Sequence, residues 1–253
     1  MRTVLAIGIG AGDPDQVTVE AIRALNRTDV FFVLDKGPAA ADLLAARRTI
    51  CERYIDAPDY RVVEVPDPPR DLSGPSYARD VGGWHDKRVA IYETLLLNQL
   101  AEGEVGSFLV WGDPALFDST LRILDAVAAR GAVVLSVEVI PGISSIQALA
   151  AAHRVALHGV GAPVQVTTGR RLADEGWPPG VDDVVVVLDG RLAFSTVDPA
   201  GVTIYWGAYL GAPDQILLSG PLAKVAGEIE RVRAEARDRK GWMFDTYLLR
   251  RER

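Results

Sequence analysis

The feature that most constrains the fold of this chain is the regular alternation of short apolar runs with stretches of helical periodicity. Runs such as TVLAIGIG (3–10), VFFVL (30–34) and SFLVWG (107–112) are each followed by a stretch whose apolar residues recur at helical spacing. Strands separated by helices are typical of parallel sheets that are covered on both faces. The sequence therefore predicts an α/β fold with mostly parallel or mixed sheets.

The chain of 253 residues is long enough for two domains of ordinary size. The stretch LHGVGAP (157–163) is punctuated by glycine and proline, and it is the best candidate for a linker. We therefore predict an N-terminal α/β domain over residues 1–157, a linker over 158–162 and a C-terminal α/β domain over 163–253. Within the first domain, residues 66–85 lack a clear pattern and predict a long functional loop.

Composition limits the partners that the chain is expected to have. Its net charge of −7 and pI near 5.1 argue against binding to nucleic acid. Cys51 is the single cysteine, which excludes an internal disulfide and a thiolate cluster for zinc. The apolar run at the N-terminus is too short for a signal peptide or a membrane span. We expect a cytoplasmic protein without a metal, a nucleic acid partner or a membrane partner.

Three glycine-rich corners stand where a predicted strand ends and a helix begins. They are GIGAGDPDQVT (8–18), WGDPALFDST (111–120) and IPGISSIQA (140–148). The carboxyl ends of the strands in open α/β sheets are where ligands bind. Glycine lets the backbone approach a ligand closely, proline fixes the turn, and a carboxylate or hydroxyl offers a polar partner. The three corners are therefore the candidate binding site.

Each corner taken singly has other interpretations. The first corner places Asp13 where the dinucleotide fingerprint requires its third glycine, so a nicotinamide dehydrogenase remains only as an alternative. The other two corners are also compatible with structural turns whose serines cap the next helix. A binding module without catalysis would show the same corners. The residues alone leave these alternatives open.

Taken together and in this order, the patterns GxGxGDP, GDP and PGxSS resemble the corrin and porphyrin methyltransferase family, the S-adenosylmethionine enzymes that methylate tetrapyrrole rings. The resemblance covers essentially the whole chain. Segments such as VLDKG, FLVWGDPALFDSTLRIL, YWGAYLGAPDQIL and GWMFDTYLLRR are similar to the members that methylate C1 of precorrin-5 in aerobic cobalamin biosynthesis and release its extruded acetyl group as acetate. Methylation at another ring position is the alternative within the family.

The resemblance implies two α/β domains with S-adenosylmethionine in the cleft between them, S-adenosylhomocysteine as a product, and a homodimer. Ala11 stands where the family usually has proline, so the first corner departs from the common pattern. Carried over by motif position, the residues expected to bind the cofactor are Gly10, Gly112, Asp113, Leu116, Ser144, Ser145, Asp189 and Gly207.

The tetrapyrrole expected as substrate is fringed with carboxylates, which arginine side chains can pair bidentately. The first corner is expected to face this ring through Gly10, Gly12 and Asp13. Solvated surface positions are the alternative interpretation for the arginines. The residues expected to bind the substrate are Gly12, Arg70, Arg88, Arg170 and Arg171.

The two expected reactions make different demands on the chain. A sulfonium already carries an activated methyl group, so methyl transfer requires positioning and no nucleophile of the protein. Removal of the acetyl group by water requires a base and a hydrogen-bond donor for the developing oxyanion. Our hypothesis for this step takes Asp13 or His85 as the base and Tyr77 as the donor. The lone histidines His153 and His158 are expected to be structural.

Overall fold

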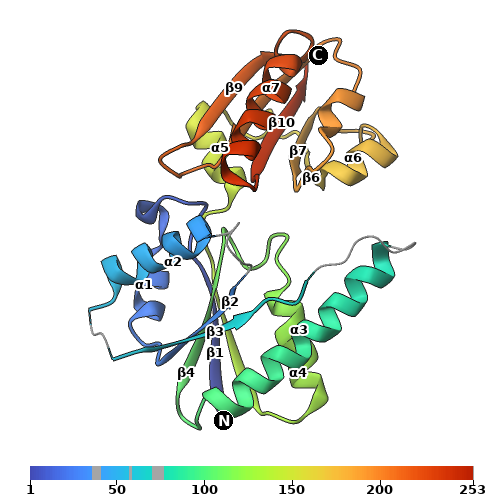
Figure 1. Cartoon of the computed structure of the whole chain (residues 1–253). Coiled ribbons are helices and arrows are strands. Elements are labelled where there is room, and N and C mark those ends of the chain that lie inside the picture. The colour runs from blue at the N-terminus through green and yellow to red at the C-terminus, as the bar shows by residue number, and fades with distance from the viewer. Residues whose placement is uncertain (36–40, 57–58, 70–76, 253) are drawn as a thin grey trace. The chain divides into compact units, whose positions relative to one another are not determined.

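The computed structural model describes residues 1–35, 41–56, 59–69 and 77–252, without the side chains of 41–42 and 77–81. The chain divides into two compact units (Figure 1). The first unit holds residues 1–10 and 14–143, and the second holds residues 11–13 and 144–253. No helix among the described residues combines the length and the apolar character needed to cross a membrane.

The first unit is built on a five-stranded sheet in the order β3-β2-β4-β1-β5, and all of its strand pairs are parallel. The central strands β1 and β4 are almost continuously buried, as expected for strands of a sheet that is covered on both faces. The strands are β1 Arg2–Gly8, β2 Val30–Asp35, β3 Arg61–Pro66, β4 Val105–Val110 and β5 Leu135–Ile140.

Helices cover both faces of this sheet (Figure 1). On one face, α1 Val19–Leu25 and α2 Ala41–Tyr54 share a core with Leu5 and Ile7 of β1, and the short 3₁₀ helix η1 Pro14–Gln16 contacts α2. On the other, α3 Tyr77–Gln99 and α4 Thr120–Arg130 enclose Val4 and Phe108. Residues that alternate along a strand thus enter two separate cores.

The second unit is built on a mixed sheet in the order β6-β7-β10-β8-β9. Only the β6 and β7 pair is parallel among these neighbours, and the other pairs are antiparallel. The strands are β6 Val164–Thr168, β7 Asp183–Val187, β8 Val202–Ala208, β9 Ile216–Pro221 and β10 Asp245–Arg251. The expectation of two α/β units with parallel or mixed sheets is confirmed.

Both faces of the second sheet are also covered. On one face, α6 Gly169–Glu175, the 3₁₀ helix η3 Ala193–Thr196 and α7 Leu222–Lys240 form a core around Trp206 and Tyr247. The helix α5 Ser145–His153 packs against β8, β9 and β10. A Cβ added at Gly207 would lie 2.9 Å from Leu149 Cδ1 of α5, and the neighbouring Trp206 points to the other side of the strand, so α5 lies on the opposite face.

Two elements differ from the sequence-based expectation. The helix α3 begins at Tyr77 and not near His85, so the second part of the predicted loop 66–85 is helical. The helix α5 belongs to the second unit, whereas its residues were placed in the first predicted domain, 1–157. Its apolar side chains contact the mixed sheet, and tertiary packing of this kind is invisible in a local pattern.

Candidate active site

The first two glycine corners are joined by backbone hydrogen bonds at the carboxyl ends of β1 and β4. The N–H of Gly112 donates to the carbonyl oxygen of Gly10 at 2.8 Å, and the N–H of Gly10 donates to that of Gly112 at 3.4 Å. Gly10 and Gly112 have φ values of 83° and 70°, a region that favours glycine. The backbones of the first and second corners are therefore hydrogen-bonded directly to each other.

Asp113 connects the second corner to the third. Its Oδ1 accepts a hydrogen bond from the N–H of Ala115 at 2.8 Å, and its Oδ2 accepts one from the N–H of Gly142 at 2.9 Å. The side chain is half-buried. Each carboxylate oxygen keeps a further lone pair, so Asp113 can still accept a hydrogen bond from a ligand.

Close approach of the corners depends on glycine. A Cβ atom at Gly142 would lie 2.1 Å from the carbonyl oxygen of Gly112, and one at Gly8 would lie 2.6 Å from the nitrogen of Gly142. Both separations are shorter than any tolerated contact, so a side chain at either position would force the backbone apart. Gly8 of the first motif and Gly142 of the third thus allow close approach to each other and to the backbone of the second motif.

The corners lie where the sheet connections diverge. The chain leaves β1 for α1 on one face of the sheet and leaves β4 for α4 on the other, although the two strands are neighbours. Such a topological switch point opens a crevice at the carboxyl ends of the strands, which is where ligands bind in open α/β sheets. This edge of the first unit is therefore the candidate binding site.

In the second unit, the predicted cofactor residues have clear structural partners. The hydroxyl of Ser144 caps α5 by accepting from the N–H of Ile146 at 3.1 Å, and Gln147 completes a capping box. The hydroxyl of Ser145 lies 2.9 Å from that of Thr246. A Cβ at Gly207 would lie 2.7 Å from Leu210 Cδ2 and 2.9 Å from Leu149 Cδ1, so a side chain there would require both leucines to move.

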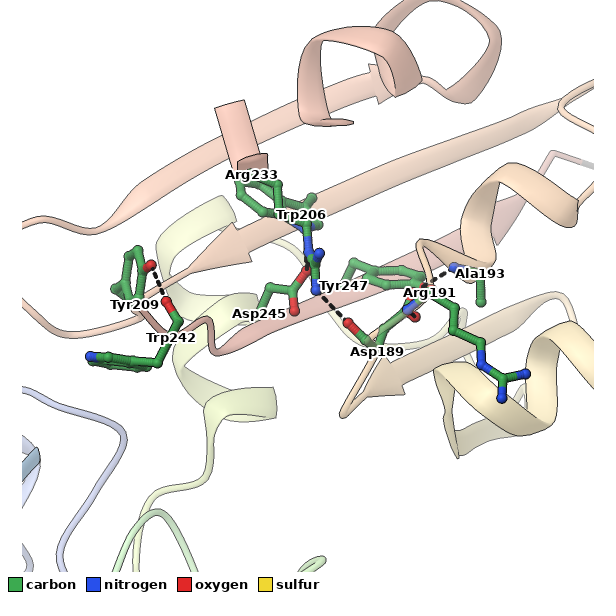
Figure 2. A network of polar contacts seen from close by, with 9 residues as sticks. All are labelled: Asp189, Arg191, Ala193, Trp206, Tyr209, Arg233, Trp242, Asp245 and Tyr247. Atoms are coloured by element: carbon green, nitrogen blue, oxygen red, sulfur yellow. Dashed lines mark hydrogen bonds and ion pairs between the residues drawn. The ribbon is translucent and has the colours of Figure 1, made fainter. Parts of the chain in front are cut away.

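Asp189 is the centre of a buried polar network (Figure 2). Its Oδ1 accepts from the N–H of Arg191 at 2.8 Å, and its Oδ2 accepts from the N–H of Ala193 and from the Tyr247 hydroxyl, both at 2.7 Å. The carboxylate thus holds the turn that follows β7. In this turn Leu188 and Leu192 both have positive φ values, which cost energy in residues with a side chain.

Arg233 extends the network toward β10 (Figure 2). Its Nε donates to Asp245 Oδ2 at 2.8 Å and its Nη2 donates to the carbonyl oxygen of Asp189, while Trp206 Nε1 donates to the same Asp245 oxygen. Burial raises the pKa of Asp245, and the hydrogen bond from Arg233 opposes that shift. Burial also raises the pKa of Tyr247 well above its ordinary value, with the Asp189 carboxylate adding to the shift.

The arginines predicted to bind the substrate have carboxylate partners within the chain. Arg88 forms a buried bidentate pair with Asp67, with Nε at 2.8 Å and Nη2 at 3.0 Å from the carboxylate oxygens. Arg171 pairs with Glu175, and Arg170 Nη1 lies 3.9 Å from Asp174, on the exposed surface of α6. Arg70 lies outside the described residues.

The structure assigns the remaining predicted residues to different units. Gly12 and Asp13 group with the second unit, and a Cβ at Gly12 would lie 2.8 Å from the carbonyl oxygen of Leu210. His85 lies on α3 in the first unit, where its ring packs edge-on against Trp84. The side chain of Tyr77 is outside the described part. The roles of Asp13, His85 and Tyr77 therefore stay predictions.

Leu116 follows the turn made by Asp113, and its N–H donates to the Asp113 carbonyl oxygen at 3.1 Å.

One further residue at the carboxyl end of the first sheet was missed by sequence reasoning. Arg47 of α2 donates from Nε to the carbonyl oxygen of Leu109 at the end of β4. The signal was a charged residue among Leu43, Ile50 and Cys51, which are apolar at helical spacing from it.

Comparisons with known proteins agree with this geometry. The model of the tetrapyrrole (corrin/porphyrin) methylases matches residues 3–226. The deacetylating precorrin-6A synthase of a Sinorhizobium species is 50% identical over 251 residues, which cover 99% of this chain and 96% of that protein. A crystal structure of a cobalamin-synthesis-related protein (CobF) from Corynebacterium diphtheriae matches with a TM-score of 0.85 and 33% identity over 99% of both chains.

A uroporphyrin-III C-methyltransferase of Thermus thermophilus, crystallised with S-adenosylhomocysteine, shares the fold. It matches with a TM-score of 0.56 and 19% identity over 98% of this chain and 91% of that one. The glycine corners at the switch point, the two α/β units and a family match that runs through most of the sequence converge on one conclusion. The chain belongs to the tetrapyrrole (corrin/porphyrin) methylases.

Proposed function

We propose that the chain transfers a methyl group from S-adenosylmethionine to C1 of precorrin-5 and releases the extruded acetyl group as acetate, giving precorrin-6A in cobalamin biosynthesis. The observation that carries this proposal is the 50% identity to a deacetylating precorrin-6A synthase over 99% of this chain. Identity of this extent includes the segments outside the three corners, and those segments carry the resemblance to the members that methylate C1.

The cofactor is proposed to bind at the glycine corners of the first unit, beside Gly10, Gly112, Asp113 and Leu116. The fit rests on Asp113. Each of its carboxylate oxygens accepts one hydrogen bond from the backbone and has a second lone pair, which can accept from a donor such as a ribose hydroxyl or an ammonium group. Bound S-adenosylmethionine supplies an activated methyl group. The task of the chain is then to hold the reactants in line, which is worth about 7 to 11 kcal/mol when alignment is good.

The predicted cofactor residues of the second unit act in two ways in this proposal. Ser144, Ser145 and Gly207 border the cofactor through the backbone that they order at the start of α5 and the end of β8. Asp189 is buried, and its carboxylate already accepts three hydrogen bonds. We therefore propose that Asp189 contributes by holding the strained turn after β7. Binding of one cofactor by residues of both units stays a prediction.

Release of the acetyl group requires a new bond from a water oxygen to the acyl carbon and cleavage of the carbon–carbon bond to the ring, which keeps the electron pair. A base must take the proton of the water, and a donor must stabilise the oxyanion. Asp13 or His85 is proposed as the base and Tyr77 as the donor.

We also propose that the enzyme is a homodimer and works in the cytoplasm.

Incubation of the purified chain with precorrin-5 and methyl-labelled S-adenosylmethionine tests the proposal. We expect the ring to gain one labelled methyl group and to lose its acetyl group, with one acetate formed for each methyl transferred. A His85→Gln variant followed by the same two readouts separates the steps, because a base for water is not needed for methyl transfer. Methyl transfer without acetate from the wild-type chain would contradict the deacetylating assignment.

A further inference from the structure

Arg47 occupies an unusual position in the buried face of α2. Leu43 precedes it by one helical turn, and Ile50 and Cys51 follow it by one turn, and these three side chains are all buried. Residues at this spacing lie on the same face of a helix as Arg47. A cation in the middle of an apolar stripe is costly to keep there unless it is paired.

The hydrogen bonds of Arg47 leave most of its guanidinium unused. Its Nε donates to the carbonyl oxygen of Leu109 at 3.3 Å, and its Nη1 donates at 3.4 Å to the carbonyl oxygen of Leu43. Among the described residues, no carboxylate oxygen lies within 4.0 Å of its nitrogens. Burial lowers the pKa of Arg47, and the Asp118 carboxylate and the Tyr92 phenol act against that shift. The buried cation Arg88, by contrast, has a bidentate carboxylate partner in Asp67.

The sheet is open where Arg47 reaches it. β2 and β4 are paired only as far as Phe32 and Phe108, although both strands continue beyond these residues. Carbonyl groups alternate between the two sides of a strand, and that of Val105 points to the β2 side because it accepts from Asp29. The carbonyl of Leu109 therefore points to the same side, beyond the last residue pair between β2 and β4. Arg47 donates to this carbonyl at the position where an N–H group of β2 would otherwise donate.

We propose that Arg47 binds a carboxylate group of a reactant at this opening between the carboxyl ends of β2 and β4. A guanidinium held in place through Nε presents its remaining N–H groups as a fork, which matches a carboxylate bidentately. The proposal rests on the proposed function, because both the tetrapyrrole and the methionine end of the cofactor carry carboxylates. The ring is the expected source of the carboxylate. The cofactor is proposed to bind at the glycine corners that follow β1 and β4, and β1 lies on the other side of β4 from Arg47.

A first test measures the melting temperature of the ligand-free chain with Arg47→Met. Methionine fills a similar volume without charge, so its substitution removes a half-buried cation that has no carboxylate partner among the described residues. We expect the melting temperature to rise by about 2–4 °C. The exposed neighbour Arg48 gives the control, because Arg48→Met should leave the melting temperature within about 1 °C of the wild type. A drop for Arg47→Met would show that the arginine serves the fold, and it would overturn the proposal.

A second test measures binding by calorimetry with two probes. The first is uroporphyrin III, a stable tetrapyrrole with side-chain carboxylates, and the second is S-adenosylhomocysteine. We expect Arg47→Met to weaken uroporphyrin binding by about tenfold to a hundredfold and to leave S-adenosylhomocysteine binding unchanged. Arg47→Lys should give an intermediate loss, because it keeps the charge without the fork. With precorrin-5 as substrate, the loss should fall on KM more than on kcat.

The outcomes separate the inference from the proposed function. Weaker binding of S-adenosylhomocysteine alone would support a carboxylate site and identify the cofactor as its source. Unchanged binding of both probes would overturn the inference, even if the wild-type chain methylates precorrin-5. If the wild-type chain does not methylate precorrin-5, the proposed function fails, while uroporphyrin binding and the melting temperature still decide the role of Arg47.

Discussion

At the residue scale, Gly142 is the position on which the packing of the glycine corners depends most directly. Its α-carbon faces the carbonyl oxygen of Gly112, and the same turn is held by the carboxylate of Asp113 through the Gly142 N–H. Backbone atoms cannot move aside as a flexible side chain can. A single methyl group at Gly142 should therefore separate the second and third corners.

We expect Gly142→Ala to lower the free energy of unfolding by about 2 kcal/mol or more, since overpacking against backbone is costly. Chemical denaturation measures the change. Gly82→Ala is the matched control, because Gly82 lies within α3 and a Cβ there meets nothing within 4 Å. Alanine at position 82 should stabilise the chain by up to about 1 kcal/mol. Equal effects of the two substitutions would contradict the proposed packing role.

Residue types in the corners could be predicted from the sequence, but their partners could not. The pattern around Asp113 indicated a carboxylate at the carboxyl end of a strand, and the structure places it there. Asp189 also follows a strand, yet its partners Tyr247 and Arg233 come from far along the chain. No local pattern shows that the Asp189 carboxylate already accepts three hydrogen bonds within the chain. For the same reason, the sequence did not show that Arg47 has no carboxylate partner among the described residues.

At the scale of elements, α3 and the end of β3 are held together by a buried polar contact. Arg88 of α3 pairs with Asp67 just after β3 and also donates to the hydroxyl of Ser119 at 3.1 Å. Its guanidinium lies 4.4 Å from the centre of the Trp84 ring, and Trp84 Nε1 donates to the carbonyl oxygen of Pro68. These contacts fix the direction in which the chain leaves β3.

Breaking this pair should be costly because a buried charge loses its partner. We expect Arg88→Gln to lower the free energy of unfolding by about 3–5 kcal/mol in urea titrations. Arg130→Gln removes the more exposed pair with Glu93 between α4 and α3, and it should cost about 1 kcal/mol or less. A combined Arg88→Met and Asp67→Leu variant should recover most of the loss. Failure of that recovery would contradict a dominant role for the unpaired charge.

The elements themselves followed from the sequence wherever an apolar period was strong. The strands β1, β2 and β4 begin and end within about two residues of the apolar runs 3–10, 30–34 and 107–112 that predicted them. The first turns of α3 were missed because YARDVGGWH has two glycines and no apolar period. Contacts of Trp84 and Arg88 with the end of β3 supply the stability that local propensity lacks there.

At the scale of the whole molecule, each unit has its own sheet with cores on its faces. Alternating strands and helices predicted the parallel sheet of the first unit. The mixed order of the second sheet could not be read in the same way, because a strand pattern does not state its direction or its neighbours. Chain length and the linker candidate predicted two α/β units, the family resemblance implied the same, and the match over residues 3–226 confirms the family.

The central claim is that this tetrapyrrole methylase acts at C1 of the ring. The measurement that tests it most directly is the carbon-13 NMR spectrum of the ring produced from precorrin-5 and S-adenosylmethionine labelled in its methyl carbon. We expect one enriched methyl signal, coupled to the quaternary carbon C1, in a product that lacks the acetyl group. An enriched methyl attached to any other ring carbon would contradict the account.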